Sequence, residues 1–112
     1  MPLPVTKIEE EPMFLVRDIM FCKPGQARAM VKKFHTLSAL LQPLGVGPLK
    51  VMTDVSSERY WMVVAEVEVD SLERYAEVQQ QSMSKKEFQD AMAGYHDSVV
   101  EGRREIYTIE KA

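Results

Sequence analysis

Alternation of apolar and polar residues predicts four strands. Residues 13–22, MFLVRDIMFC, are rich in apolar residues at both odd and even positions, a pattern typical of a strand buried on both faces. Residues 59–69 show the clearest alternation, because every odd position from Trp61 to Val69 is apolar. Shorter stretches at residues 49–55 and 103–110 are predicted to be the second and the last strand.

Two helical regions separate these strands. Residues 27–41 carry apolar side chains at a spacing of three and four, which predicts an amphipathic helix. The second region begins with D-x-x-E at residues 70–73, the form of an N-terminal capping pair. A second signal of this kind, S-x-x-E at residues 84–87, predicts a break near Ser82, and Gly102 is expected to end the region.

The predicted order of elements is β-α-β-β-α-β. Right-handed crossovers and a central hairpin fold this order into a ferredoxin-like α+β sandwich, with a four-stranded antiparallel sheet and the helices on one face. Residues 13–112 are expected to form this single domain. Residues 1–12 carry three prolines and the acidic run Glu9–Glu11, which predicts a flexible arm outside the core.

The helix-free face of this sheet is predicted to be an interaction surface. The first strand is apolar on both faces, and the third strand extends the second apolar surface. A contiguous exposed apolar patch marks a binding surface, so we expect a second copy packed sheet to sheet about a two-fold axis. The residues expected on this dimer face are Arg17, Ile19, Phe21, Met62 and Val64. The alternative is a monomer whose arm, residues 1–12, folds over the face.

Composition argues against several classes of function and location. A net charge of −3, with Lys and Arg scattered among acids, argues against binding to nucleic acid. No apolar run approaches the ~20 residues of a membrane span. The lone Cys22 excludes an intramolecular disulfide, and the N-terminus lacks the basic and apolar blocks of a signal peptide, so we expect a cytoplasmic protein.

Two stretches resemble known proteins. FCKPGQARAMVKKF at residues 21–34 and FQDAMAGYHDSVVEGRREIYTIE at residues 88–110 are similar to the dimeric α+β barrel superfamily. The resemblance is to its NIPSNAP-like and antibiotic biosynthesis monooxygenase-like proteins in particular, and it covers residues 13–110. It implies the fold and the homodimer. The superfamily includes cofactor-independent oxygenases, heme-degrading enzymes and many proteins of unknown role, so the resemblance implies fold more than chemistry.

Heme degradation and metal binding are not expected. The heme-degrading branch has an Asn in the first strand, a Trp at the end of the third and a His in the second helical region, and the corresponding positions here are Asp18, Val69 and Met92. The two histidines, His35 and His96, fall on different helical regions, with no Cys or acid at metal-ligand spacing. We therefore expect no metal and no cofactor.

Asp18 is the main candidate for a functional side chain. Alternation places it on the helix-covered face, where loss of water suits a carboxylate to act as a general base or to anchor a ligand. The alternative is a structural ion pair with Arg103 or Arg104, because the last strand lies beside the first in this topology. The alternative is favoured.

The other candidates for a pocket are Cys22, Trp61, Tyr95 and His96. Ordinary structural roles compete with each, since free cysteines and large aromatic residues usually belong to a core and a lone histidine has no fixed partner. Two functions stay open. One is a small homodimeric domain that binds a small apolar ligand between sheet and helices, and the other is a cofactor-independent monooxygenase-like enzyme acting on an aromatic or polyketide-like substrate.

Overall fold

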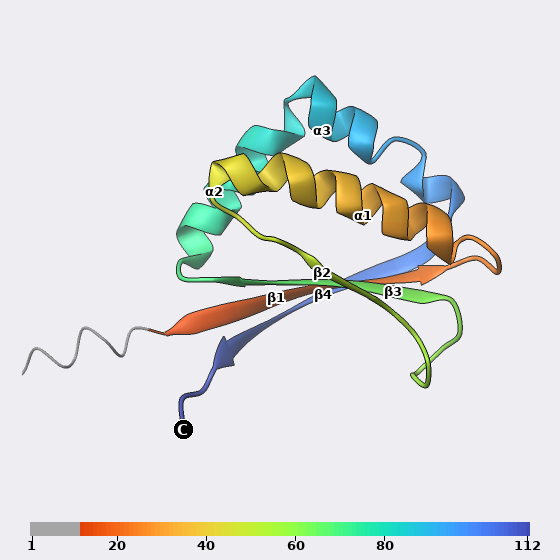
Figure 1. The fold of residues 1–112 in the computed structure, drawn as a ribbon, viewed down its shortest axis with the longest axis horizontal. Coiled ribbons are helices and arrows are strands. Elements are labelled where there is room, and N and C mark those ends of the chain that lie inside the picture. Colours follow the sequence, from red (N-terminus) through yellow and green to blue (C-terminus); the bar gives the residue numbers. More distant parts are fainter. Residues whose placement is uncertain (1–11) are drawn as a thin grey trace, which may run out of the picture.

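A computed structural model describes residues 12–112 of the chain. One antiparallel sheet of four strands, in the order β2-β3-β1-β4, carries all the helices on one face (Figure 1). The elements are β1 (Met13–Cys22), α1 (Ala27–Leu41), β2 (Lys50–Thr53), β3 (Met62–Val69), α2 (Leu72–Met83), α3 (Lys86–Ala91) and β4 (Val99–Ile109), with short 3₁₀ helices at Gln42–Leu44 and Tyr95–Asp97. The predicted α+β sandwich is confirmed. Of the expected arm, residues 1–12, all but Pro12 lie outside the described residues.

The last strand is longer than the sequence predicts. It begins at Val99, and the expected helix end at Gly102 is wrong, because this glycine lies inside β4 opposite Met20. A Cβ atom at Gly102 would lie 3.2 Å from the sulfur of Met20, so a side chain there would fit only if Met20 shifted. The helix α3 ends at Ala91, and Gly94, with a φ of 78°, lies just before the 3₁₀ helix Tyr95–Asp97. Because β4 starts early, it pairs with the whole length of β1.

The second and third strands are shorter than predicted, because residues 54–61 form a loop. Asp54 accepts a hydrogen bond from the backbone N–H of Met62 at 2.8 Å, and the carbonyl of Trp61 accepts one from Cys22 at 2.9 Å. Trp61 has a φ of 65°, in the left-handed region, so the chain turns sharply before β3 begins. Figure 1 shows this loop on the side of the sheet away from the helices.

The second helical region is broken where the sequence predicts. α2 ends at Met83 and α3 begins at Lys86. The cap of α2 is Ser71 rather than Asp70, and its hydroxyl accepts a hydrogen bond from the N–H of Arg74 at 3.1 Å. Ser84 does not cap α3, because the residue before that helix is Lys85, which makes no side-chain cap bond. Ser84 instead follows the end of α2, and its hydroxyl donates to the carbonyl of Gln81 at 2.9 Å.

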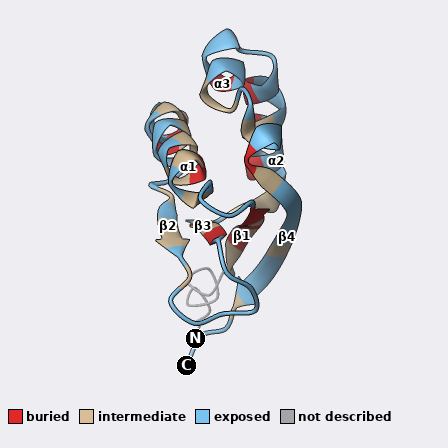
Figure 2. Cartoon of the chain, turned by 90° about the vertical axis from the view of Figure 1, so that its right-hand side faces the viewer, coloured by how far each residue is buried: buried red, intermediate tan, exposed pale blue. Residues whose placement is uncertain are grey.

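The core lies between the sheet and the helices. Under the first half of α1, Met30 and Phe34 pack on Val63, and all three are almost fully buried. Under α2, Val78 packs on a second cluster around Val16. Figure 2 shows that the buried parts of α1 and α2 face one another and the sheet. Each such side chain contributes about 1.5–3 kcal/mol by leaving water, which holds the helices on this face. In residues 12–112, each helix is either too short or too polar to cross a membrane.

Candidate functional site

A cleft of about 480 Å³ lies between the helices and the covered face of the sheet. Side chains of α1 line one side, side chains of α2 and α3 line the other, and β1 and β4 contribute the floor. The lining is largely apolar, with Met20, Phe34, Leu37, Leu41, Leu49, Met83, Phe88 and Met92. A volume of this size and this composition are those of small-molecule sites.

One charged pair lies in this largely apolar lining. The Nε of Arg104 donates to Oδ1 of Asp18 at 2.6 Å and its Nη2 donates to Oδ2 at 3.0 Å. The Nη1 of Arg104 donates to Oε1 of Gln79 at 2.7 Å. Asp18 and Arg104 are direct partners in the β1–β4 register, so strand pairing places them together, and Gln79 reaches them from α2. The favoured interpretation of Asp18, an ion pair with one of the two arginines, matches this geometry.

The surroundings of Arg104 favour the charged form of its guanidinium. The hydrogen bond to Asp18 raises the pKa of Arg104, although burial acts in the opposite direction. Burial raises the pKa of the Tyr75 phenol, whose ring centre lies 5.7 Å from the guanidinium carbon of Arg104. The side chains of Asp18 and Arg104 are 24% and 38% exposed, so the pair can be reached from solvent.

The structure separates the five pocket candidates. Asp18 and Tyr95 line the cleft, whereas Cys22, Trp61 and His96 do not. Cys22 is buried in the core, and burial raises the pKa of its thiol, which disfavours the reactive thiolate. Trp61 lines a separate cleft beside the start of α1, and the exposed ring of His96 lies 3.9 Å from that of Tyr95, centre to centre.

Sequence reasoning missed Gln79 and left the partner of Asp18 open between two arginines. The available signal for Gln79 is its spacing of four from Tyr75, which puts both residues on one face of a helix. In the part of the chain that the structure describes, no three His, Cys, Asp or Glu side chains cluster as a metal site would require.

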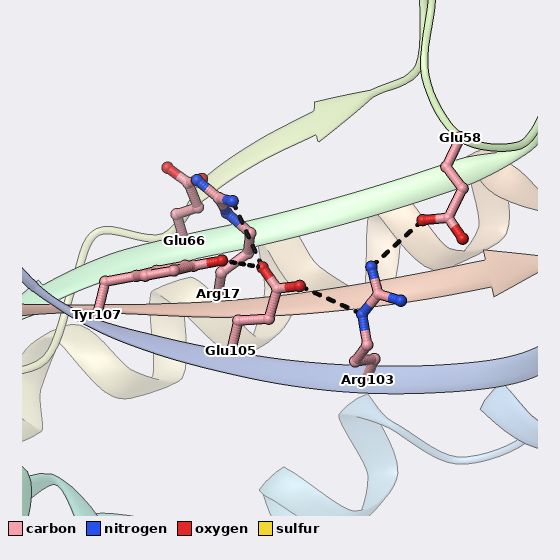
Figure 3. Close-up of polar contacts among 6 residues, drawn as sticks. All are labelled: Arg17, Glu58, Glu66, Arg103, Glu105 and Tyr107. Atoms are coloured by element: carbon pink, nitrogen blue, oxygen red, sulfur yellow. Dashed lines mark hydrogen bonds and ion pairs between the residues drawn. The ribbon is translucent and has the colours of Figure 1, made fainter.

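The helix-free face of the sheet carries an ion-pair network instead of a wide apolar patch. The network consists of Arg17, Glu58, Glu66, Arg103, Glu105 and Tyr107 (Figure 3). Arg17 lies 2.6 Å from Glu66 and 3.5 Å from Glu105. Glu105 also contacts Arg103 at 3.3 Å and accepts a hydrogen bond from the hydroxyl of Tyr107 at 2.7 Å. Charges of both signs therefore alternate across this face.

Three of the expected dimer-face residues are already buried within one chain. Ile19, Phe21 and Met62 are 4%, 2% and 5% exposed. They form a small cluster with the partly buried Val64. The guanidinium of Arg59, from the β2–β3 loop, lies 3.9 Å from the centre of the Phe21 ring. The expectation of a contiguous exposed apolar patch here is therefore wrong, and the homodimer itself stays a prediction.

Known proteins share this fold at low sequence identity. No family model matches the sequence, and no curated protein matches it. An uncharacterized NIPSNAP-like domain protein from Burkholderia xenovorans is 17% identical, with a TM-score of 0.74 over 92% of this chain and 89% of that chain. A NIPSNAP family protein from Agrobacterium tumefaciens is 17% identical, with a TM-score of 0.74 over 89% of this chain and 90% of that one. A putative antibiotic biosynthesis monooxygenase from Chloroflexus aurantiacus is 19% identical, with a TM-score of 0.66 over 89% and 95%. These structures confirm that the fold is the one implied by the sequence resemblance.

Proposed function

We propose that the protein is a homodimeric domain that binds a small apolar ligand in the cleft between the sheet and the helices. The observation that carries the proposal is the cleft itself. Its walls are mostly apolar side chains from three helices, and one charged pair, Asp18 with Arg104, lies among them. Apolar walls supply affinity and a few placed polar groups supply orientation, which is how small-molecule sites are usually built.

A cofactor-independent monooxygenase-like enzyme is the second candidate. The fold shared with the putative monooxygenase from Chloroflexus supports it. An enzyme that removes a proton from its substrate needs a base that is positioned to reach that proton rather than held in a structural contact. Within residues 12–112, Asp18 is the only carboxylate that lines the cleft, and both of its oxygens accept hydrogen bonds from Arg104. We therefore rank binding above catalysis.

Ligand binding is tested with N-phenyl-1-naphthylamine, a neutral apolar dye whose fluorescence rises when it leaves water. We expect saturable binding to the wild-type protein. Met92→Trp adds bulk to a residue that lines the cleft and should weaken binding at least tenfold. Met52→Trp is the matched control, because Met52 lies on the other side of the sheet, beside the β2–β3 loop. Equal binding by the wild type and Met92→Trp would place the dye elsewhere and refute the proposal.

Homodimerisation through the helix-free face is supported by the alternation of positive and negative side chains on it, which suits a self-complementary contact. A stable interface should bury about 1,600 Å² in total. We expect sedimentation velocity at micromolar concentration to show a dimer. Arg17→Glu places a negative charge beside Glu66 and Glu105 and should favour the monomer, whereas Arg28→Glu, at an exposed position of α1, should not. A wild-type monomer at micromolar concentration would contradict the dimer.

A further inference from the structure

The guanidinium of Arg104 has N–H groups left over. An arginine side chain carries five of them. Two donate to Asp18 and one donates to Gln79. One N–H on Nη1 and one on Nη2 therefore have no partner among the described residues. Because Arg104 lines the cleft and is 38% exposed, these donors are available to a molecule bound there.

Several other polar groups of the lining are already paired within the protein. The side-chain nitrogen of Gln89 donates to the carbonyl of Met83, and the hydroxyl of Ser82 donates to the carbonyl of Val78. Gln79 already accepts from Arg104, and Asp18 is held by two bonds. The free donors that remain in the lining include the two N–H groups of Arg104, the amide N–H groups of Gln79 and the hydroxyls of Tyr75 and Tyr95. Arg104 is the only charged donor among them, so its hydrogen bond to a neutral acceptor is the strongest that the cleft offers. A ligand that offers an acceptor fits this balance.

The charge of the cleft selects against an anion. Asp18 and Arg104 are the only charged side chains in the lining that the structure describes, and they cancel. A carboxylate entering the cleft would lose its hydration and would meet an arginine whose charge Asp18 already balances, which is costly. A carbonyl oxygen loses far less hydration and can still accept a charge-assisted hydrogen bond from Arg104.

The shape of the apolar part favours an aromatic body. Four aromatic side chains line the cleft: Phe34, Tyr75, Phe88 and Tyr95. Aromatic rings pack on one another in offset or edge-to-face arrangements that add to the gain from burial. The remaining walls are leucine and methionine side chains, and methionine adapts to an irregular apolar surface.

We infer that the ligand class is a neutral aromatic molecule with one carbonyl oxygen, of the aromatic ketone type, and that Arg104 donates to this oxygen. Asp18 and Gln79 are positioning residues that fix the guanidinium. This inference rests on the proposed function, because it assigns the head group of a ligand that the cleft must first bind.

The test compares three probes that share a naphthalene body. They are 2-acetylnaphthalene, 2-ethylnaphthalene and 2-naphthoate, titrated into the full chain by isothermal titration calorimetry at neutral pH. We expect the ketone to bind about tenfold more tightly than the hydrocarbon, since one hydrogen bond to a charged group contributes about that factor. The naphthoate should bind more weakly than the ketone.

Variants assign the preference to Arg104. Arg104→Gln alone would leave Asp18 without its cation, so the main variant is the double change Asp18→Asn with Arg104→Gln, which removes both charges together. We expect its affinity for the ketone to fall about tenfold, with the affinity for 2-ethylnaphthalene within twofold of the wild type. Gln79→Leu should reduce the ratio of the two affinities by about threefold, a readout that general loosening of the fold would not change. Arg28→Gln, at an exposed position outside the cleft, should leave the ratio unchanged.

The outcomes separate this inference from the function on which it rests. Equal affinities for the ketone and the hydrocarbon, or tightest binding of the naphthoate, would overturn the inference and leave apolar binding intact. A ketone preference that survives the double change would also overturn it. If none of the probes binds, the proposed function fails and the inference fails with it.

Discussion

Each face of the sheet carries an ion pair between β1 and a neighbouring strand, but the surroundings of the two pairs differ. Asp18 and Arg17 are neighbours on β1 and point to opposite faces. Each pairs with a residue directly opposite it on an adjacent strand, Asp18 with Arg104 on β4 and Arg17 with Glu66 on β3. On the covered face the ion pair is the only charged group in the described lining of an apolar cleft, whereas on the helix-free face it belongs to a network of several charged side chains. Both pairs are partly exposed.

The number of apolar residues on a sheet face therefore does not predict which kind of segment, a helix, a loop or a partner chain, covers that face. The covered face carries helices over its apolar residues, such as Val16 and Val63. The other face has its own buried cluster around Phe21, yet a loop and arginine side chains are enough to cover it. Long arginine side chains shield apolar rings while their charged ends stay in water. A strand that is apolar on both sides therefore does not require a partner chain on each.

The largest expected effect on stability compares a phenylalanine packed under a helix with one packed under a loop. Phe34→Ala removes a ring packed between α1 and the sheet, and should lower the free energy of unfolding by about 3–5 kcal/mol. Phe21→Ala is the matched change on the helix-free face, where both rings are equally buried. We expect a smaller loss there, because the loop and Arg59 can move into the space. Urea denaturation measures both. Equal losses would mean that the loop packs as firmly as the helix.

The next effect concerns the ion pair of the cleft. Asp18→Asn leaves Arg104 facing a neutral partner and should destabilise the fold by about 1–2 kcal/mol, less than the ~3–5 kcal/mol of a fully buried pair because both side chains are partly exposed. Asp90→Asn removes the partner of Lys86 on α3, where both side chains are mostly exposed, and should change stability by at most about 0.5 kcal/mol. Thermal denaturation compares the two. An unchanged or raised midpoint for Asp18→Asn would favour a functional carboxylate over a structural one.

A smaller effect tests the helical cover itself. Ser71→Ala removes the cap of α2, the helix that brings Tyr75 and Gln79 to the cleft, and should cost about 1 kcal/mol. In a domain of this size this loss lowers the melting temperature by about 4–8 °C. Ser57→Ala is the control, because Ser57 is exposed in the β2–β3 loop, away from every helix end, and the change should have almost no effect. If both changes shift the midpoint equally, the capping bond of Ser71 is not what stabilises α2.

Most of the fold could be predicted from the sequence, since its signals are local. The pattern of β1 and the helical stripe of α1 give both elements correctly. The start of β4 could not be predicted from the sequence, because Val99 fits the apolar spacing of a helix as well as that of a strand. Gly102 also has the appearance of a helix-ending glycine, and only its contact with Met20 shows that it lies inside a strand. The alternation of β3 continues back to Trp61, so nothing in the pattern reveals the turn that the 65° φ of Trp61 makes.

The site was predicted only in part, because its geometry depends on strand register. Alternation placed Asp18 on the covered face, but the choice between Arg103 and Arg104 requires the pairing of β1 with β4 to be known to one residue. A shift by one position would bring the other arginine, from the other face, opposite Asp18. The hydrogen bond between Gln79 and Arg104 and the burial of Ile19 both arise from packing between segments that are distant in the sequence. The residues adjacent to them in the sequence therefore do not predict either feature.

The smallest expected effect belongs to the helix-free face and depends on pH. The hydrogen bond from Tyr107 lowers the pKa of Glu105 below its ordinary 4.5, and the charges of Arg103 and Arg17 act in the same direction. A carboxylate with a lowered pKa stabilises the folded state above that ordinary value, and the contribution is lost as the pH falls through the lower pKa. The stability difference between the wild type and Glu105→Gln should therefore shrink as the pH falls below about 4.5.

Tyr107→Phe removes the leading cause and should bring the pKa of Glu105 back toward its ordinary value, as followed by the carboxyl carbon shift of Glu105 in an NMR titration. The same hydrogen bond raises the pKa of Tyr107, so its contribution is present at neutral pH and lost as the pH rises through that raised value. Tyr75, on the covered face, has its pKa raised by burial instead, and Tyr107→Phe should leave its titration unchanged. If Glu105 in the wild type titrates at its ordinary pKa, the network does not hold its carboxylate in the charged form, and the helix-free face is an ordinary solvated surface.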